Sequence, residues 1–198
     1  MEKIAFIEIN NYMAKLIIAE TKTNALFNIV TKRVVPLELG EDFEKDHFFK
    51  RPQIDRAIDV LKQFKQTCNM FGVEKSHTIG TFLSELKPKN FNSFVDEVYT
   101  KCGFKLDFCD ETEQANALFK ATLSTVDSNK AFACLLEQDS LRLVQYNRRG
   151  VVNFATFSFG PVTLLQNFSK EEFAEEDKRI EAISSYIDAQ LKTIEWVE

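Results

Sequence analysis

The first twenty residues alternate short apolar runs with one polar turn. Isoleucine-rich stretches at Ile4–Ile9 and Met13–Ala19 flank the polar residues Asn10–Tyr12. Two apolar runs separated by a short polar turn are typical of a β-hairpin. A third β-rich run, Ala25–Val35, follows and is closed by Pro36. We therefore expect a three-stranded antiparallel meander at the start of the chain.

Helical spacing then alternates with strand patterns. Between Pro52 and Phe71 apolar residues recur every three or four positions, and Gly72 follows, which predicts a helix with a proline start and a glycine stop. The same reasoning predicts four further elements. They are a strand at Lys75–Gly80, a helix at Asn90–Cys102 stopped by Gly103, a strand at Phe104–Phe108 and a helix at Glu111–Ser124.

The pattern breaks at residues 126–129 and then restarts. Its second part predicts strands at Lys130–Leu136, Leu141–Tyr146 and Val151–Phe157, a helical stretch at Pro161–Phe168, and a long helix from Glu171 to about Ile194. The opening βββα order is thus repeated, and an internal repeat is a fold signature. Strands that alternate with helices after a meander predict an α/β fold with a mixed sheet. We expect a first lobe at 1–126 and a shorter second lobe at 127–198.

Composition narrows the possible partners. The net charge of -5 and a pI near 5.3 argue against sequence-independent binding to nucleic acid, which needs a basic face. No apolar run approaches the roughly 20 residues that span a bilayer, and the start has no signal-peptide pattern, so we expect a cytoplasmic protein without a membrane partner. The four cysteines form no CxxC pair and are interpreted as buried thiols rather than a zinc site or a disulfide framework.

A doubled βββαβαβα unit is the plan of the actin-like ATPase (ribonuclease H-like) superfamily, and one branch of it is similar in sequence. From Ile4 to Val197 the chain resembles the N-terminal region of the Ppx/GppA family of exopolyphosphatases and guanosine pentaphosphate phosphohydrolases. The resemblance is carried by three stretches, residues 54–81, 90–119 and 150–165. It implies an actin-like α/β fold in which the second copy of the unit is shortened.

The resemblance also implies candidate phosphate-binding turns. The family's first turn reads D-I-G-S-N-S, and here Glu8 stands at the acid, with Asn10 and Asn11 at the following phosphate-contacting positions. The family's second loop, D-I-G-G-G-S, corresponds to 135–140, where Asp139 and Ser140 are the candidate contacts. All three glycines are replaced there. Because glycine-rich loops let successive N–H groups converge on phosphate oxygens, carboxylates in their place would repel a polyanion.

Further family positions bear on catalysis. Thr81 follows the fourth predicted strand and is a candidate phosphate contact, while the family arginine beyond it would fall near Glu85. The family's catalytic glutamate lies in a G-x-E-E-A-R segment that corresponds to 111–116. Depending on the alignment, the general base is Glu113 or has become Gln114, and an amide cannot accept a proton from water near neutral pH.

Plainer interpretations stand beside these. Glu8 is otherwise a solvated strand-end carboxylate, Glu113 a glutamate favoured in the first turn of a helix, and Asp139 with Ser140 a polar hairpin turn. The basic pairs Lys32–Arg33 and Arg148–Arg149 are remnants of an anion-binding cleft or ordinary exposed residues.

These observations lead to three hypotheses. The preferred one is a catalytically degenerate family member that needs no cofactor and acts as a binding or structural module. The second is an active, Mg²⁺-dependent exopolyphosphatase or nucleotide phosphohydrolase that uses Glu113 and Glu8, with Glu8 also as a metal ligand and polyphosphate or a nucleotide as substrate. The third is a homo-oligomeric scaffold. We also expect a helix or a second copy of the chain to cover the edge of the Lys130–Leu136 strand, because open strand edges are seldom left unprotected.

Overall fold

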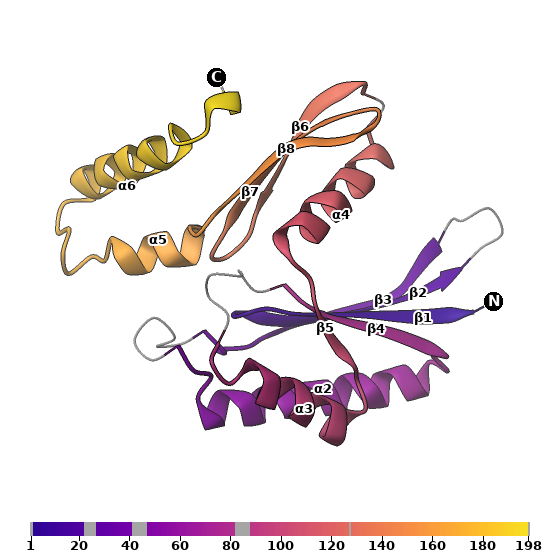
Figure 1. The fold of residues 1–198 in the computed structure, drawn as a ribbon. Helices are drawn as coiled ribbons and strands as arrows, with labels where there is room; N and C mark the ends of the chain where they lie inside the picture. The colour runs from indigo at the N-terminus through magenta and orange to yellow at the C-terminus, as the bar shows by residue number, and fades with distance from the viewer. Residues whose placement is uncertain (1, 22–26, 41–46, 82–87, 127, 198) are drawn as a thin grey trace. The chain divides into compact units, whose positions relative to one another are not determined.

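The computed structural model describes residues 2–21, 27–40, 47–81, 88–126 and 128–197 of the 198. It divides into two compact units, Met1–Asp110 and Glu111–Glu198, and each unit is described by itself (Figure 1).

The first unit is built on a five-stranded sheet in the order β3-β2-β1-β4-β5. β1, β2 and β3 pair antiparallel as the predicted meander, whereas β4 pairs parallel to β1 and β5 parallel to β4. The elements are β1 (Lys3–Ile9), β2 (Met13–Thr21), β3 (Phe27–Pro36), α2 (Arg51–Met70), β4 (Lys75–Gly80), α3 (Phe91–Cys102) and β5 (Leu106–Phe108).

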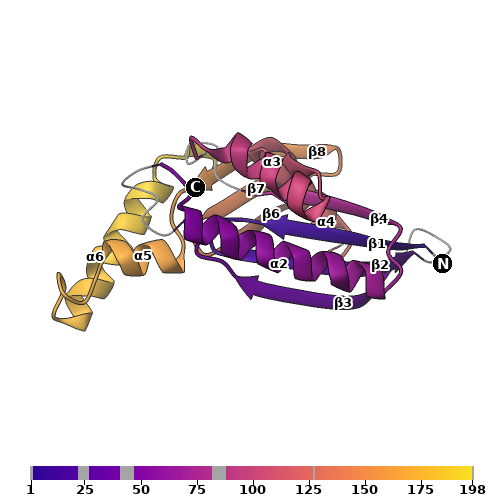
Figure 2. The same ribbon diagram turned by 90° about the horizontal axis from the view of Figure 1, so that it is seen from below.

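One face of this sheet packs on α2 and α3 (Figure 2). Alternate residues of β1, among them Ala5, Ile7 and Ile9, are buried in a continuous core with the apolar stripes of the two helices, as the period of two in a strand requires. The helices end at the predicted glycines. Gly72 and Gly103 have φ values of 64° and 70°. This left-handed conformation is unfavourable for any residue that has a Cβ atom.

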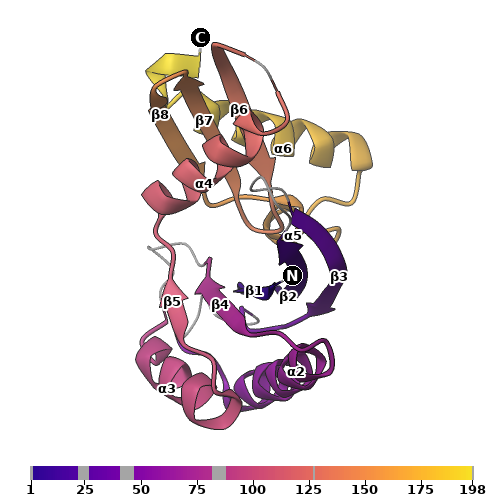
Figure 3. The ribbon, with the colours of Figure 1, turned by 90° about the vertical axis from the view of Figure 1, so that its right-hand side faces the viewer.

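The second unit is a three-stranded antiparallel sheet in the order β6-β7-β8. α4 packs on one face through Ala115, against Val144 and Tyr146 of β7. α5 and α6 pack on the other face, next to Leu141 and Leu143 of the same strand (Figure 3). The elements are α4 (Glu111–Leu123), β6 (Lys130–Leu136), β7 (Leu141–Asn147), β8 (Gly150–Phe157), α5 (Pro161–Asn167), α6 (Glu176–Leu191) and a 3₁₀ turn at Glu195–Val197.

Three sequence predictions are corrected. The long helix begins at Glu176 rather than Glu171; the rings of Phe168 and Phe173 lie 5.7 Å apart, a contact that turns the chain back before the helix. β5 is shorter than predicted because Phe104 is buried in the helix-facing core instead of pairing in the sheet. Cys134 is exposed and Cys109 is only partly buried, although Cys68 and Cys102 are buried as expected.

The contacts divide the chain before α4, whereas the repeat of elements suggested a boundary after it. α4 packs on the second sheet, with most of its contacts to β7 and β8, so it belongs to the second compact unit. The lobes 1–126 and 127–198 rest on a different criterion and stay a prediction. Within the described residues, β6 pairs with β7 alone, so the covered edge also stays a prediction. None of the helices that the structure describes is long and apolar enough to cross a membrane.

Candidate functional site

The hairpin turn after β1 is closed by the side chain of Asn10. Its Oδ1 accepts hydrogen bonds from the backbone N–H groups of Tyr12 and Met13, both at 2.9 Å, and its own N–H donates to the Met13 carbonyl at 3.0 Å. This is an Asx-type turn, in which a side-chain oxygen takes the place of a backbone acceptor. Two amides of the predicted phosphate-binding turn are therefore already satisfied from within the turn.

The segment after β3 covers the same turn. Leu37 donates its N–H to the Tyr12 carbonyl at 2.7 Å, and Gly40 donates to the Asn11 carbonyl at 3.0 Å. A Cβ atom at Gly40 would lie 2.8 Å from the Cβ of Asn11, so the close approach requires glycine. Asn10 and Asn11 are each only 4% exposed. The two predicted phosphate contacts thus lie beneath a covering loop.

Two other predicted residues, Glu8 and Thr81, meet at neighbouring strand ends. β1 and β4 run parallel, and the Thr81 hydroxyl donates to Glu8 Oε1 at 3.0 Å. The second carboxylate oxygen of Glu8 accepts from Lys15 Nζ at 3.1 Å. Sequence reasoning missed Lys15, although the hairpin register, in which Glu8 lies opposite Lys15, is a signal that could have found it.

This environment bears on the predicted metal role of Glu8. The ammonium group of Lys15 balances the charge of the carboxylate and occupies one of its oxygens. In the part of the chain that the structure describes, no group of three or more histidine, cysteine, aspartate or glutamate residues is placed to hold a metal ion. A cation at Glu8 would have to displace Lys15 and draw most of its ligands from water or substrate.

The predicted second phosphate loop is a tight turn between β6 and β7. Glu137 donates its N–H to the Ser140 carbonyl at 2.8 Å, and Ser140 is 3% exposed. The start of α5 packs on this turn: Val162 donates to the Gln138 carbonyl at 2.9 Å. A Cβ atom at Gly160, the residue before α5, would lie 2.3 Å from the Glu137 carbonyl oxygen. Only glycine therefore lets the backbone come this close to the turn.

α4 directs Gln114, and not Glu113, toward this turn. Gln114 is buried, whereas Glu113 is on the exposed side of the helix. The Gln114 Oε1 atom accepts a hydrogen bond from Nη2 of Arg142 at 2.5 Å, and Nη1 of the same guanidinium lies 3.3 Å from Glu137 Oε2. Arg142 is 3% exposed. Sequence reasoning missed it, and its only signal was an arginine between two apolar residues of a strand.

Two candidates remain, Asp139 and Glu85. Asp139 is the third residue of the second turn, next to Ser140. Glu85, the position expected to replace a family arginine, lies outside the described residues. The Glu8–Thr81 pair belongs to the first unit and the Gln114–Arg142–Glu137 group to the second, so each unit brings together candidates of its own.

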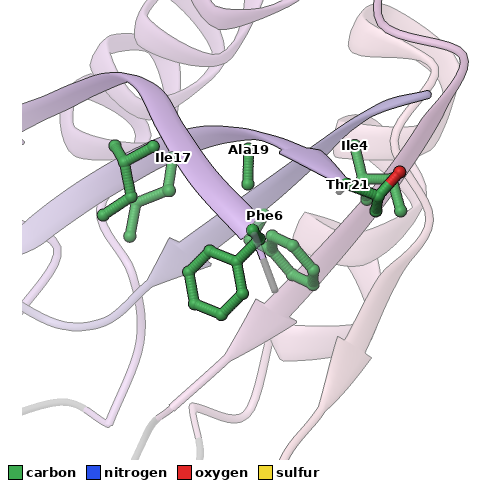
Figure 4. A pocket seen from close by; sticks show the side chains of 7 residues that line it. Ile4, Phe6, Ile17, Ala19 and Thr21 are labelled. Carbon is green, nitrogen blue, oxygen red and sulfur yellow. The ribbon is translucent and has the colours of Figure 1, made fainter. Parts of the chain in front are cut away.

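A cavity lies on the face of the first sheet that is opposite α2 and α3. It has a volume of about 450 Å³, and Phe6 and Ile17 project into it (Figure 4). Its other lining residues are Ile4, Ala19, Thr21, Phe27 and Ile29. None of these described lining residues is charged, so the wall that they form is unsuited to phosphate chemistry.

Comparison with known proteins identifies the class. The profile of the Ppx/GppA phosphatase family matches residues 17–197. The chain therefore belongs to the Ppx/GppA phosphatase family. A bifunctional 3-dehydroquinate synthase/phosphatase of Fusobacterium nucleatum is 24% identical to it over 203 residues, covering 96% of this chain and 30% of that protein.

Solved structures agree on the fold. The Ppx/GppA family member of Aquifex aeolicus superimposes with a TM-score of 0.77 at 20% identity, over 97% of this chain and 62% of that one. MreB5 of Spiroplasma citri, solved bound to ADP, has a TM-score of 0.50 at 9% identity, over 89% and 58% of the two chains. The fold is thus the predicted α/β fold of the actin-like ATPases. The chain spans less than two thirds of the length of these relatives.

Proposed function

We propose that this member of the Ppx/GppA family is catalytically degenerate and acts as a binding or structural module. The observation that carries the proposal is the Gln114–Arg142–Glu137 group. α4 presents an amide to the second turn, in the segment where family members carry the catalytic glutamate, and the amide oxygen accepts from a buried guanidinium. An amide so placed cannot act as a general base toward water.

The first turn supports the same proposal. Hydrolysis of a phosphoanhydride needs N–H groups that are aimed at the phosphoryl oxygens as charge develops on them. Here Asn10 Oδ1 already accepts hydrogen bonds from two backbone N–H groups of that turn. Loss of one preorganised donor costs about 2.7–4 kcal/mol of transition-state stabilisation in other enzymes. A phosphate would have to displace Asn10 before it could bind these amides.

The rival is an active, Mg²⁺-dependent exopolyphosphatase or nucleotide phosphohydrolase. It is favoured by family membership and by the Glu8–Thr81 pair, which sets a carboxylate and a hydroxyl at adjoining strand ends. In this alternative Glu8 binds Mg²⁺ after Lys15 moves away, and Glu113 activates water.

Phosphate release separates the two. The protein is incubated with polyphosphate, ATP or guanosine tetraphosphate, each with and without Mg²⁺, and the phosphate released is measured over hours at micromolar protein. We expect no release above the buffer blank. Mg²⁺-dependent release that disappears in both Glu8→Gln and Glu113→Gln would overturn the proposal and establish the rival.

A thermal-shift titration with the same compounds adds a measurement of binding. A ligand that binds only the folded protein raises its melting temperature by mass action. A shift without turnover is the expected behaviour of a degenerate member that still binds phosphate. If the melting temperature does not shift and no phosphate is released, the result favours a structural role over phosphate binding.

A further inference from the structure

The hairpin between β7 and β8 carries a cluster of basic residues. Lys130, Arg148 and Arg149 line a hollow of about 590 Å³ at the end of the second sheet where β6 begins. The other residues of its wall are the polar Ser128, Asn129 and Asn147. Among the residues that the structure describes, none of those that line the hollow carries a carboxylate.

Hydrogen bonds fix the backbone beneath these cations. Lys130 lies opposite Asn147 in the β6–β7 ladder. Arg148 donates its N–H to the Asn129 carbonyl at 3.1 Å, and Arg149 donates its N–H to Asn147 Oδ1 at 2.8 Å. Two short segments, 129–130 and 147–149, are thereby tied together. The backbone that carries the three basic side chains is therefore held in place, although the side chains themselves are exposed.

The three cations have no ion-pair partner among the residues that the structure describes. Several other exposed basic groups are paired, among them Arg51 with Asp55, Arg56 with Glu38, and Lys178 with Glu175. The protein has 30 acidic and 25 basic residues, so carboxylates are in excess. Three neighbouring unpaired cations therefore make a local positive field that runs against the net charge of the chain.

We propose that this hollow binds a compact multivalent anion, a compound with several phosphate groups in a row. One exposed charge pair contributes only about 0.2–1 kcal/mol, so a single phosphate ion would bind weakly. A ligand that presents several charges at once adds the contributions of all three cations. Amide N–H groups of the Asn129 and Asn147 side chains can donate to the bridging oxygens.

This site shares no residue with the two candidate phosphate-binding turns. β6 runs from Lys130 to Leu136, and the Glu137–Ser140 turn follows at its far end. Seven residues of a strand span roughly 23 Å at about 3.3 Å per residue. The proposal thus holds whether or not the chain hydrolyses phosphoanhydrides, because no residue is shared.

The test is isothermal titration calorimetry with tripolyphosphate and with orthophosphate as probes, at two salt concentrations. The variant is Arg148→Ser/Arg149→Ser, and the matched control is Lys170→Ser/Lys192→Ser, which removes the same charge from two exposed lysines of the same unit. We expect tripolyphosphate to bind the natural protein and the control alike, orthophosphate to bind at least about tenfold more weakly, and the arginine variant to lose about tenfold or more.

Each other result counts against the proposal. Equal affinities in the two double variants would place the anion elsewhere, and no binding of tripolyphosphate by the natural protein would remove the site. Circular dichroism confirms that the variants fold, as exposed side chains allow. The Glu8→Gln and Glu113→Gln variants should bind tripolyphosphate as the natural protein does, because neither residue lines the hollow. A loss of binding at the hollow can therefore be told apart from a loss of turnover at the candidate catalytic residues.

Discussion

At the scale of single residues, four side chains bear on what the two candidate phosphate-binding turns can do. Asn10 satisfies the amides of the first turn, and Arg142 joins Gln114 to Glu137 at the second. In both places a side chain of this protein fills hydrogen-bonding capacity that a phosphate or a water would otherwise use. Glycine or a free carboxylate at these positions would leave that capacity open.

Replacing Arg142 by alanine tests this view of the second turn. The change removes the guanidinium N–H groups that donate to Gln114 Oε1 and Glu137 Oε2, and it takes the Arg142 cation away from a mostly buried carboxylate. We expect the free energy of unfolding to fall by about 3 kcal/mol, the low end for a broken buried pair because Glu137 keeps 16% of its side chain exposed. Urea denaturation measures the change.

The control is Arg56→Ala. Arg56 pairs with Glu38 at 2.6 Å, but both side chains are about half exposed, so the loss should stay below about 1 kcal/mol. Arg142→Lys keeps the charge but not the planar fork, and it should fall between the two. If Arg142→Ala is no worse than Arg56→Ala, the buried group does not hold the second turn.

Sequence reasoning reached part of the candidate site. Glu8 and Thr81 were predicted, and the structure joins them because the ends of β1 and β4 are adjacent. Lys15 and Arg142 were not found, since each acts through a contact that depends on strand register or helix packing. The choice between Glu113 and Gln114 also needed the structure, because only the docking of α4 decides which side chain faces the sheet.

At the scale of elements, the bounds of a helix were predicted well where apolar residues recur at regular spacing and a glycine follows the last of them. α2 and α3 have buried stripes at helical spacing and end at glycines with positive φ, so their ends were found within a residue. The start of α6 was missed. Its acidic run suits a helix N-terminus, but the contact between Phe168 and Phe173, which sequence alone does not reveal, delays the helix to Glu176.

α2 and α3 are also joined by charge. Arg51 donates to Glu97 Oε1 at 2.7 Å, and Lys101 donates to Glu97 Oε2 at 2.7 Å. The hydrogen bonds from Arg51 and then Lys101 lower the pKa of Glu97 from 4.5 to about 2. A carboxyl whose pKa is lowered by folding stabilises the folded state above its unfolded pKa. That contribution is lost as the pH falls from about 4.5 toward 2.

The pH dependence of unfolding tests this pair. At pH 7 the natural protein should be more stable than Glu97→Gln, and the difference should shrink as the pH is lowered through this range. Thermal denaturation at pH 7 and pH 3 measures it. Glu181→Gln, an exposed change on α6, is the control. A difference between the natural protein and Glu97→Gln that stays the same at both pH values would rule out this role for Glu97.

At the scale of the whole molecule, the two compact units differ in how their cores are built. The first has one continuous core between its sheet and two helices. The second has two small clusters on opposite faces of a three-stranded sheet, and α6 contributes no buried residue. Because burial of apolar surface is the main stabilising term, the units should differ in stability.

Hydrogen exchange followed by mass spectrometry at increasing denaturant tests this expectation. Amides of β1 and β2 should exchange last, since they lie on the continuous core, and those of α6 first. Arg142→Ala should speed exchange in residues 111–198 and leave the first sheet unchanged, while Glu97→Gln at pH 7 should affect only the first unit. A single cooperative loss of protection across both units, in the natural protein and in both variants, would show that the two units unfold together although each has its own apolar clusters.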